Sequence, residues 1–197
     1  EASAAENPIE IRTSLRLWLG IGVGAVLLAV VVVGWLSYSR RGSALTESDS
    51  ILLTDFTNTT GDPVFDGTLK QALAVKLAES PFLNIVSERR VHETLRFMGR
   101  PPEERVTAAL GREICQRQGV KAMMTGAIAP LGSTYVVTLK AVNCQTGDEL
   151  ASVQQEAASK EEVLKALGRA ATALRGDLGE ALSSIEKFNA PIEQATT

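Results

Sequence analysis

Residues 17–36 form a stretch of twenty amino acids without a charged side chain, LWLGIGVGAVLLAVVVVGWL. A helix rises about 1.5 Å per residue, so twenty residues extend about 30 Å, which is the thickness of the hydrocarbon core of a bilayer. A single isolated span must satisfy its backbone hydrogen bonds internally, which only a helix does. The sequence therefore predicts a transmembrane helix over residues 17–38, with Trp18, Trp35 and Tyr38 as membrane-interface anchors.

Two other interpretations of this stretch are less favoured. A buried helix of a soluble protein rarely lacks a polar stripe over twenty residues. A cleaved secretory signal usually has a shorter apolar core, and the chain begins at Glu1 rather than at a methionine, which suggests an excerpt of a longer protein. The orientation is not set by charge, because two arginines precede the stretch and two follow it.

The predicted span also contains a pair of glycines, Gly20 and Gly24, with the spacing G-x-x-x-G. Small residues at this spacing let two membrane helices approach closely. A homodimer packed through these residues in the lipid bilayer is therefore one alternative. Glycine is also common in membrane helices in general, so a monomer is the other alternative.

The rest of the chain has the composition of an ordinary domain. Of the 197 residues, 20 are Lys or Arg and 23 are Asp or Glu, which gives a net charge of −3. Residues 1–41 carry +1 of this charge and residues 42–197 carry −4. The absence of a basic surface excess argues against a nucleic-acid partner. We predict a juxtamembrane segment 1–16, the transmembrane helix 17–38, a linker 39–50, one α/β domain 51–188 and a polar tail 189–197.

The hydrophobic pattern of the domain predicts alternating strands and helices. Short apolar runs and period-two alternation predict strands, whereas apolar residues three or four apart predict helices. Ser159 to Glu162 has the S-x-x-E pattern of a capping box, which predicts the start of one last helix that continues to Ile185. The fold class is mixed α/β in the order β-α-β-α-α-β-β-β-α, preceded by the single transmembrane helix. The expected strands are 51–56, 83–86, 122–129, 134–143 and 149–157, and the other expected helices are 65–79, 87–97 and 107–119.

The only two cysteines are Cys115 and Cys144. In an oxidising compartment a disulfide across this separation would stabilise the fold by roughly 3 to 4 kcal/mol in the loop-entropy model, whereas in the cytosol both would be buried thiols. We favour the disulfide for a domain outside the cytoplasm.

No constellation of a known enzyme class is present. Nucleophile elbows, Cys-x-x-Cys pairs and phosphate-binding loops are lacking, and His92, the one histidine, is expected to be an ordinary helix residue. Asp55, Asp62 and Asp66 form an acidic group that could attract a cation, although such residues more often end strands and cap helices. We therefore predict no catalytic, cofactor-binding or metal-binding residue.

The stretch from ILLTDFTNTTGDPVFDG to SERRVHETLRFMGRP, followed by LGREICQRQGVKAMMTGAIAPLGSTYVVTLKAVNCQTGDELA, resembles a known arrangement. It is similar to the region between kinase and repeats in bacterial transmembrane serine/threonine protein kinases with C-terminal tetratricopeptide repeats. The first half is also similar to the TolB-like N-terminal α/β domain. The resemblance implies a single-pass membrane protein with a cytoplasmic N-terminus and an extracytoplasmic C-terminal domain. It also implies a kinase domain before residue 1 and helical repeats to which the tail 189–197 leads.

Three functions follow as hypotheses. The leading one is a non-catalytic membrane anchor and extracytoplasmic sensor or scaffold of a receptor-like kinase, whose ATP and Mg²⁺ would belong to the missing kinase domain and whose partners would include the repeats of the same parent chain. The alternative is a stand-alone, membrane-tethered TolB-like module for protein interaction or transport. An enzyme acting through Asp55, Asp62 and Asp66 is the third, and it requires these aspartates to converge in a pocket.

Overall fold

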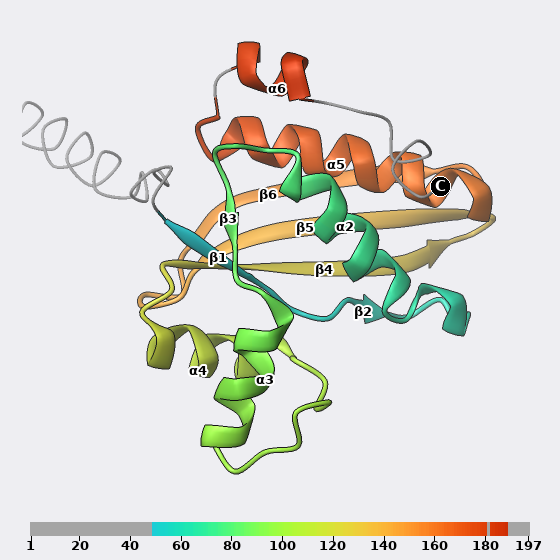
Figure 1. Ribbon diagram of the computed structural model, residues 1–197. Coiled ribbons are helices and arrows are strands. Elements are labelled where there is room, and N and C mark those ends of the chain that lie inside the picture. The colour runs from blue at the N-terminus through green and yellow to red at the C-terminus, as the bar shows by residue number, and fades with distance from the viewer. Residues whose placement is uncertain (1–48, 181, 189–197) are drawn as a thin grey trace, which may run out of the picture. The chain divides into compact units, whose positions relative to one another are not determined.

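A mixed sheet with a parallel and an antiparallel half organises the domain in the computed structural model, which describes residues 49–180 and 182–188 (Figure 1). The strand order is β3-β1-β4-β5-β6, and β2 pairs with β4 beyond the end of β1. β1 runs parallel to β3 and β4, whereas β4, β5 and β6 form an antiparallel meander. The strands are β1 (Ser50–Leu53), β2 (Thr57–Asn58), β3 (Asn84–Ile85), β4 (Ala122–Leu131), β5 (Thr134–Asn143) and β6 (Glu149–Ala157).

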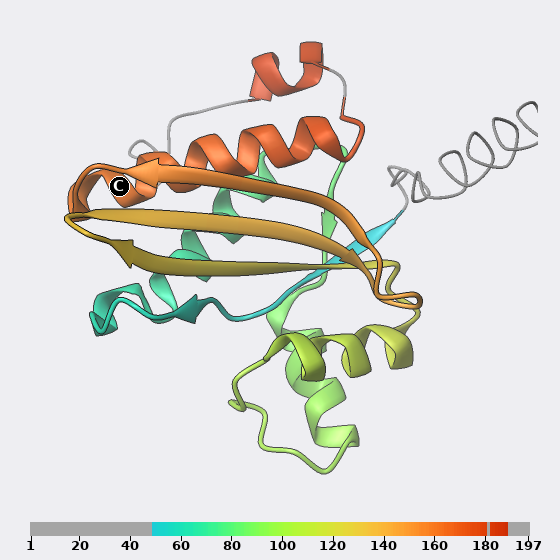
Figure 2. The same ribbon diagram turned by 180° about the vertical axis from the view of Figure 1, so that it is seen from behind.

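Helices cover both faces of the parallel half. α2 (Thr68–Ala78) and α5 (Val163–Asp177) lie together on one face, and α3 (Glu88–Phe97) and α4 (Ala108–Gln118) lie on the other (Figures 1 and 2). The remaining elements are the short helices η1 (Pro63–Phe65) and η2 (Lys160–Glu162), and α6 (Leu182–Phe188), which follows α5.

The hydrophobic residues divide into two cores, one on each face of the sheet. Ile51 and Leu53 of β1 belong to the larger core under α2 and α5, while Leu52 between them belongs to the smaller core under α3 and α4. Successive side chains of a strand point to opposite faces, so the run ILL is apolar throughout because both faces are covered. β1 is therefore the buried centre of the domain.

The far part of the meander is covered on one face only. Val137, Leu139 and Ala141 of β5 are buried beneath α5, whereas Thr138 is half-buried and Lys140 is exposed on the opposite face. Figure 2 shows that α3 and α4 lie at the other end of the sheet. This coverage accounts for the alternation of apolar and polar residues along β5.

Close approaches between layers depend on two glycines. A Cβ atom at Gly126 of β4 would lie 2.4 Å from the ring of Phe56, and one at Gly111 of α4 would lie 2.7 Å from Cγ2 of Thr54. The first glycine lets the Phe56 ring lie flat on the sheet, and the second brings α4 against the end of β1.

Most predicted elements are confirmed, including the mixed α/β order. Thr107 caps α4 by accepting a hydrogen bond from the Leu110 N–H, and Gly119 ends that helix in the left-handed conformation. Three local features differ from the predictions. Residues 57–58 form β2, a strand that was not predicted, and the Ser159 hydroxyl donates to the Glu161 carboxylate rather than capping a helix. The last helix is divided at Gly179, where φ is +105°.

The predicted transmembrane helix is not supported and is corrected. Residues 17–38, including Trp18, Gly20, Gly24, Trp35 and Tyr38, lie outside the described residues. Among the helices that the structure describes, none is long and apolar enough to cross a bilayer. The fold class of the described residues is therefore a mixed α/β domain alone. The boundaries 1–16, 17–38, 39–50, 51–188 and 189–197 stay predictions.

The structure pairs Cys115 of α4 with Cys144, just after β5, in a disulfide with Cα atoms 5.9 Å apart. Both residues belong to the smaller core. The bond ties α4 to the turn between β5 and β6.

We expect protein purified without reductant to contain no free thiol. Reduction should then lower the free energy of unfolding by about 3 to 4 kcal/mol, because the crosslink restricts the unfolded chain. Thiol counting by mass spectrometry and urea unfolding with and without reductant measure both effects. Two free thiols in the unreduced protein would contradict the pairing.

Candidate functional site

An open groove with a volume of about 800 Å³ lies between α2 and the beginning of α3. It lies at the carboxyl ends of β1 and β3, the edge at which α/β sheets most often bind ligands. We call it the α2–α3 groove. Its apolar part is formed by Leu53, Ala74, Val75, Ala78, Ile85, Val86 and Val91, and its polar part by Asp55, Asp66, Thr68, Lys70, Gln71, Ser87 and Glu88.

Asp55 holds the inner end of the groove together. One carboxylate oxygen lies 2.8 Å from Nζ of Lys70 on α2, and the other accepts a hydrogen bond of 2.6 Å from the N–H of Val106. The backbone N–H of Asp55 in turn donates to the carbonyl of Val106 at 2.9 Å. Nζ of Lys70 also lies 3.7 Å from the Glu88 carboxylate at the beginning of α3. The end of β1 is thus linked to α2, to α3 and to the loop before α4.

A second, smaller hollow of about 190 Å³ continues the groove past Asp55, Lys70 and Glu88. It adds His92, Glu103 and Glu104 to the lining. The α2–α3 groove itself has three carboxylates, Asp55, Asp66 and Glu88, and one lysine, Lys70, which is a formal charge of −2. The second hollow adds Glu103 and Glu104, and the Arg100 guanidinium lies 2.7 Å from the Glu104 carboxylate. The lining of the groove is therefore acidic.

The groove side of α2 explains why this helix is apolar on more than one side. Leu69, Leu73 and Leu77 are buried in the larger core, as the helical spacing predicts. Ala74 and Val75 line the groove instead, and Val75 is 38% exposed. A single core-facing stripe would not require these apolar residues. This excess of apolar residues was the sequence signal for a second surface on α2.

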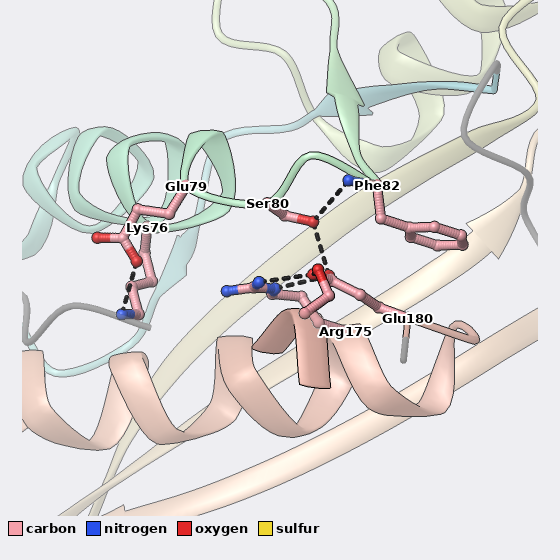
Figure 3. Close-up of polar contacts among 7 residues, drawn as sticks. Lys76, Glu79, Ser80, Phe82, Arg175 and Glu180 are labelled. Carbon is pink, nitrogen blue, oxygen red and sulfur yellow. Dashed lines mark hydrogen bonds and ion pairs between the residues drawn. The ribbon is translucent and has the colours of Figure 1, made fainter. Parts of the chain in front are cut away.

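A buried polar network holds the loop that follows α2. Ser80, in the loop from α2 to β3, donates a hydrogen bond of 2.6 Å to Oε2 of Glu180 (Figure 3). Arg175 of α5 donates to both oxygens of Glu180, from Nε at 2.8 Å and from Nη2 at 2.7 Å. Ser184 of α6 donates to the same carboxylate at 2.8 Å. We call these four residues the Glu180 network; they join α2, α5 and α6.

The two charged residues of the Glu180 network are buried. The side chains of Arg175 and Glu180 are 0% and 1% exposed. Burial alone would raise the pKa of Glu180, but the hydrogen bonds from Arg175, Ser80 and Ser184 outweigh it and lower the pKa from 4.5 to about 2. The carboxylate is therefore charged at neutral pH, and it neutralises the buried guanidinium. These residues were missed by sequence analysis, although an arginine within the apolar series of α5 is an unusual feature.

The three aspartates considered as a cation site do not converge. Asp55 and Asp66 line the groove, but Asp66 accepts a hydrogen bond of 3.1 Å from Asn58, and Asp62 caps η1 through the Val64 N–H at 3.0 Å. A hydrogen bond from Lys160 lowers the pKa of Asp62 and raises that of Lys160. Within the described ranges, no group of three or more His, Cys, Asp or Glu residues is arranged to hold a metal.

Comparisons with known proteins identify a shared fold but no family. No protein-family model matches the sequence, and no curated protein matches it. The C-terminal domain of LpoB from Salmonella enterica has a TM-score of 0.53 at 16% identity, over 61% of this chain and 90% of that one. The same domain from Escherichia coli has a TM-score of 0.52 at 16% identity, over 58% and 85%. TolB from Acinetobacter baumannii has a TM-score of 0.45 at 14% identity, over 70% and 30%.

These findings correct the resemblance to kinases. The LpoB C-terminal domains share this fold, and neither a family model nor a curated protein links the chain to a kinase or to tetratricopeptide repeats. The kinase origin, the repeats and the assignment as a single-pass membrane protein with an extracytoplasmic C-terminal domain are therefore withdrawn. At 16% identity, the similarity to LpoB is one of fold.

Removing the charge of Glu180 should strongly destabilise the domain. Glu180→Gln leaves the Arg175 guanidinium buried without its counter-charge, and breaking such a pair costs about 3 to 5 kcal/mol. Urea unfolding measures the loss. The matched control is Glu149→Gln, which removes an exposed pair with Lys140 and should cost less than about 1 kcal/mol. Equal effects of the two substitutions would contradict the role of the network.

The same carboxylate should make stability depend on pH in the acid range. The pKa of Glu180 is lower in the folded protein than in the unfolded chain, so its contribution is complete above pH 4.5 and is lost as pH falls toward about 2. The loss is on the order of 3 kcal/mol. Unfolding curves over this range should show the difference between the wild type and Glu180→Gln shrinking as pH falls. A constant difference would contradict the lowered pKa.

Proposed function

We propose that this chain is a non-catalytic module that binds a partner protein through the α2–α3 groove. The observation that supports it is the groove itself, an open hollow at one edge of the sheet whose lining combines apolar and charged residues. Interaction surfaces commonly combine an apolar centre with a polar rim. Small-molecule pockets, by contrast, usually enclose most of their ligand.

The chemistry of the lining supports a binding role more than catalysis. Asp55 and Lys70 are the most enclosed charged groups of the groove, with side chains 25% and 18% exposed, and they are paired with each other. Asp55 is also bound to the backbone of Val106. These contacts use both groups to hold the elements together. The proposal needs no cofactor or metal.

The proposed function corresponds to the second hypothesis in its coarse form, a protein-interaction or accessory module, rather than to a kinase anchor. The fold shared with the LpoB C-terminal domains agrees with this module more than with a kinase anchor. The nature of the partner is a separate question.

Photocrosslinking in the source organism tests the proposal. A benzophenone amino acid replaces Val75 in the groove or, as a matched control, Leu131 at the end of β4; these residues are 38% and 60% exposed. We expect illumination to yield a discrete protein adduct from position 75 and none from position 131. The groove position should react because a bound partner lies within reach of its side chain.

Two results would contradict the proposal. One is the absence of a protein adduct from position 75 when the variant is folded and expressed at the wild-type level. The other is the same adducts from both positions, which would indicate contact without a preferred surface. Circular dichroism of both purified variants verifies the fold.

A further inference from the structure

β3 offers backbone hydrogen-bonding groups beside the groove. It is an edge strand of the sheet, and among the described residues no strand pairs with its outer side. Ile51 is the partner of Ile85, and the N–H of Val86 donates to the carbonyl of Ile51 at 2.9 Å. In a parallel ladder this register directs the N–H and C=O of Ile85 away from β1. Ile85 also lines the groove.

An exposed strand edge beside a groove is the arrangement used by domains that bind an extended peptide as an added strand. In that mode, backbone hydrogen bonds hold the peptide, and pockets beside the edge receive alternate side chains. α2 and the beginning of α3 border the edge here (Figure 1), and their residues Val75 and Glu88 line the hollow next to Ile85.

The charge of the groove indicates which peptide it accepts. Its carboxylates exceed its lysine by two, and Glu88 has a side chain that is 76% exposed. Opposite charges across an interface favour encounter and exclude partners of like charge. An acidic or neutral segment would leave this charge uncompensated, whereas a segment with Lys or Arg residues would balance it.

We propose that the occupant of the α2–α3 groove is an extended, basic segment of the partner protein, which adds to β3 as an edge strand. Its backbone pairs with Ile85. Its cationic side chains lie near Asp66 and Glu88, and its apolar side chains contact Val75 and the neighbouring groove floor. This inference rests on the proposed function and adds the chemistry and conformation of the bound segment.

Peptide binding by fluorescence anisotropy tests the inference with the full chain. The probe is a labelled octapeptide of alternating lysine and valine, compared with an octapeptide of alternating glutamate and valine. A third peptide carries the lysine–valine sequence with N-methylated backbone amides, which cannot pair with a strand edge. We expect saturable binding of the first peptide, at least tenfold weaker binding of the N-methylated form, and no binding of the acidic peptide.

Paired variants separate the groove from the general charge of the protein. The double substitution Asp66→Asn and Glu88→Gln should weaken binding of the basic peptide about tenfold. The control, Asp148→Asn and Glu156→Gln, removes the same charges from exposed residues outside the groove and should change affinity less than twofold. Both proteins must first show wild-type unfolding curves.

Several outcomes would overturn the inference. Three results would show an electrostatic contact without strand pairing. The N-methylated peptide could bind as tightly as the unmodified basic peptide, or the polyamine spermine could displace the basic peptide as well as unlabelled peptide does. The third such result is an equal loss of affinity in the two double variants. Self-association that the peptide reverses would identify a second copy of this chain as the occupant. A crosslinked partner at position 75 together with no binding of the basic peptide would overturn this inference and leave the proposed function standing.

Discussion

The burial of β1 on both faces is the constraint on which the rest of the domain depends. Ile51 and Leu53 require one helical layer, and Leu52 requires another, so α2 with α5 and α3 with α4 must all pack around one short strand. The chain leaves this strand at Asp55, where the two layers meet. The carboxylate there joins Lys70 of α2 to the backbone of Val106. The groove is a consequence of this junction, because two helices on opposite faces diverge from the same edge of the sheet.

The Glu180 network adds a polar constraint to a largely apolar structure. A buried ion pair contributes little net stability compared with well-packed apolar residues, but breaking it is costly. Its geometry is directional, since Arg175 binds both oxygens of Glu180 while Ser80 and Ser184 bind one oxygen each. We infer that it selects one arrangement of the α2–β3 loop. That loop leads directly into the strand edge beside the groove, so the network positions Ile85 as well as stabilising the fold.

Local patterns predicted most of the fold, and long-range contacts explain what they missed. Alternation along β5 and the apolar run of β1 depend on neighbouring residues, and both strands were predicted. β2 forms because Thr57 and Asn58 pair with β4 residues about seventy positions away. Ser80 and Glu180 are one hundred residues apart in the chain. Lys70 forms an ion pair with Asp55, although β2 and η1 separate them in the sequence. Asp55 was singled out as a member of an acidic group with Asp62 and Asp66, whereas its partners Lys70 and Val106 were not. The resemblance to kinases followed sequence phrases that the comparisons of sequence and structure do not support.

The central claim is that the β3 edge of the α2–α3 groove pairs with an extended basic segment. Amide hydrogen exchange of the isotope-labelled full chain, measured by NMR with and without the lysine–valine octapeptide, tests it most directly. The account predicts that the amide of Ile85, which faces away from β1, becomes protected at least tenfold when the peptide is bound, while Thr138 on the uncovered sheet face is unchanged. Unchanged exchange at Ile85 under saturating peptide, or protection confined to the edge of β6, would contradict the account.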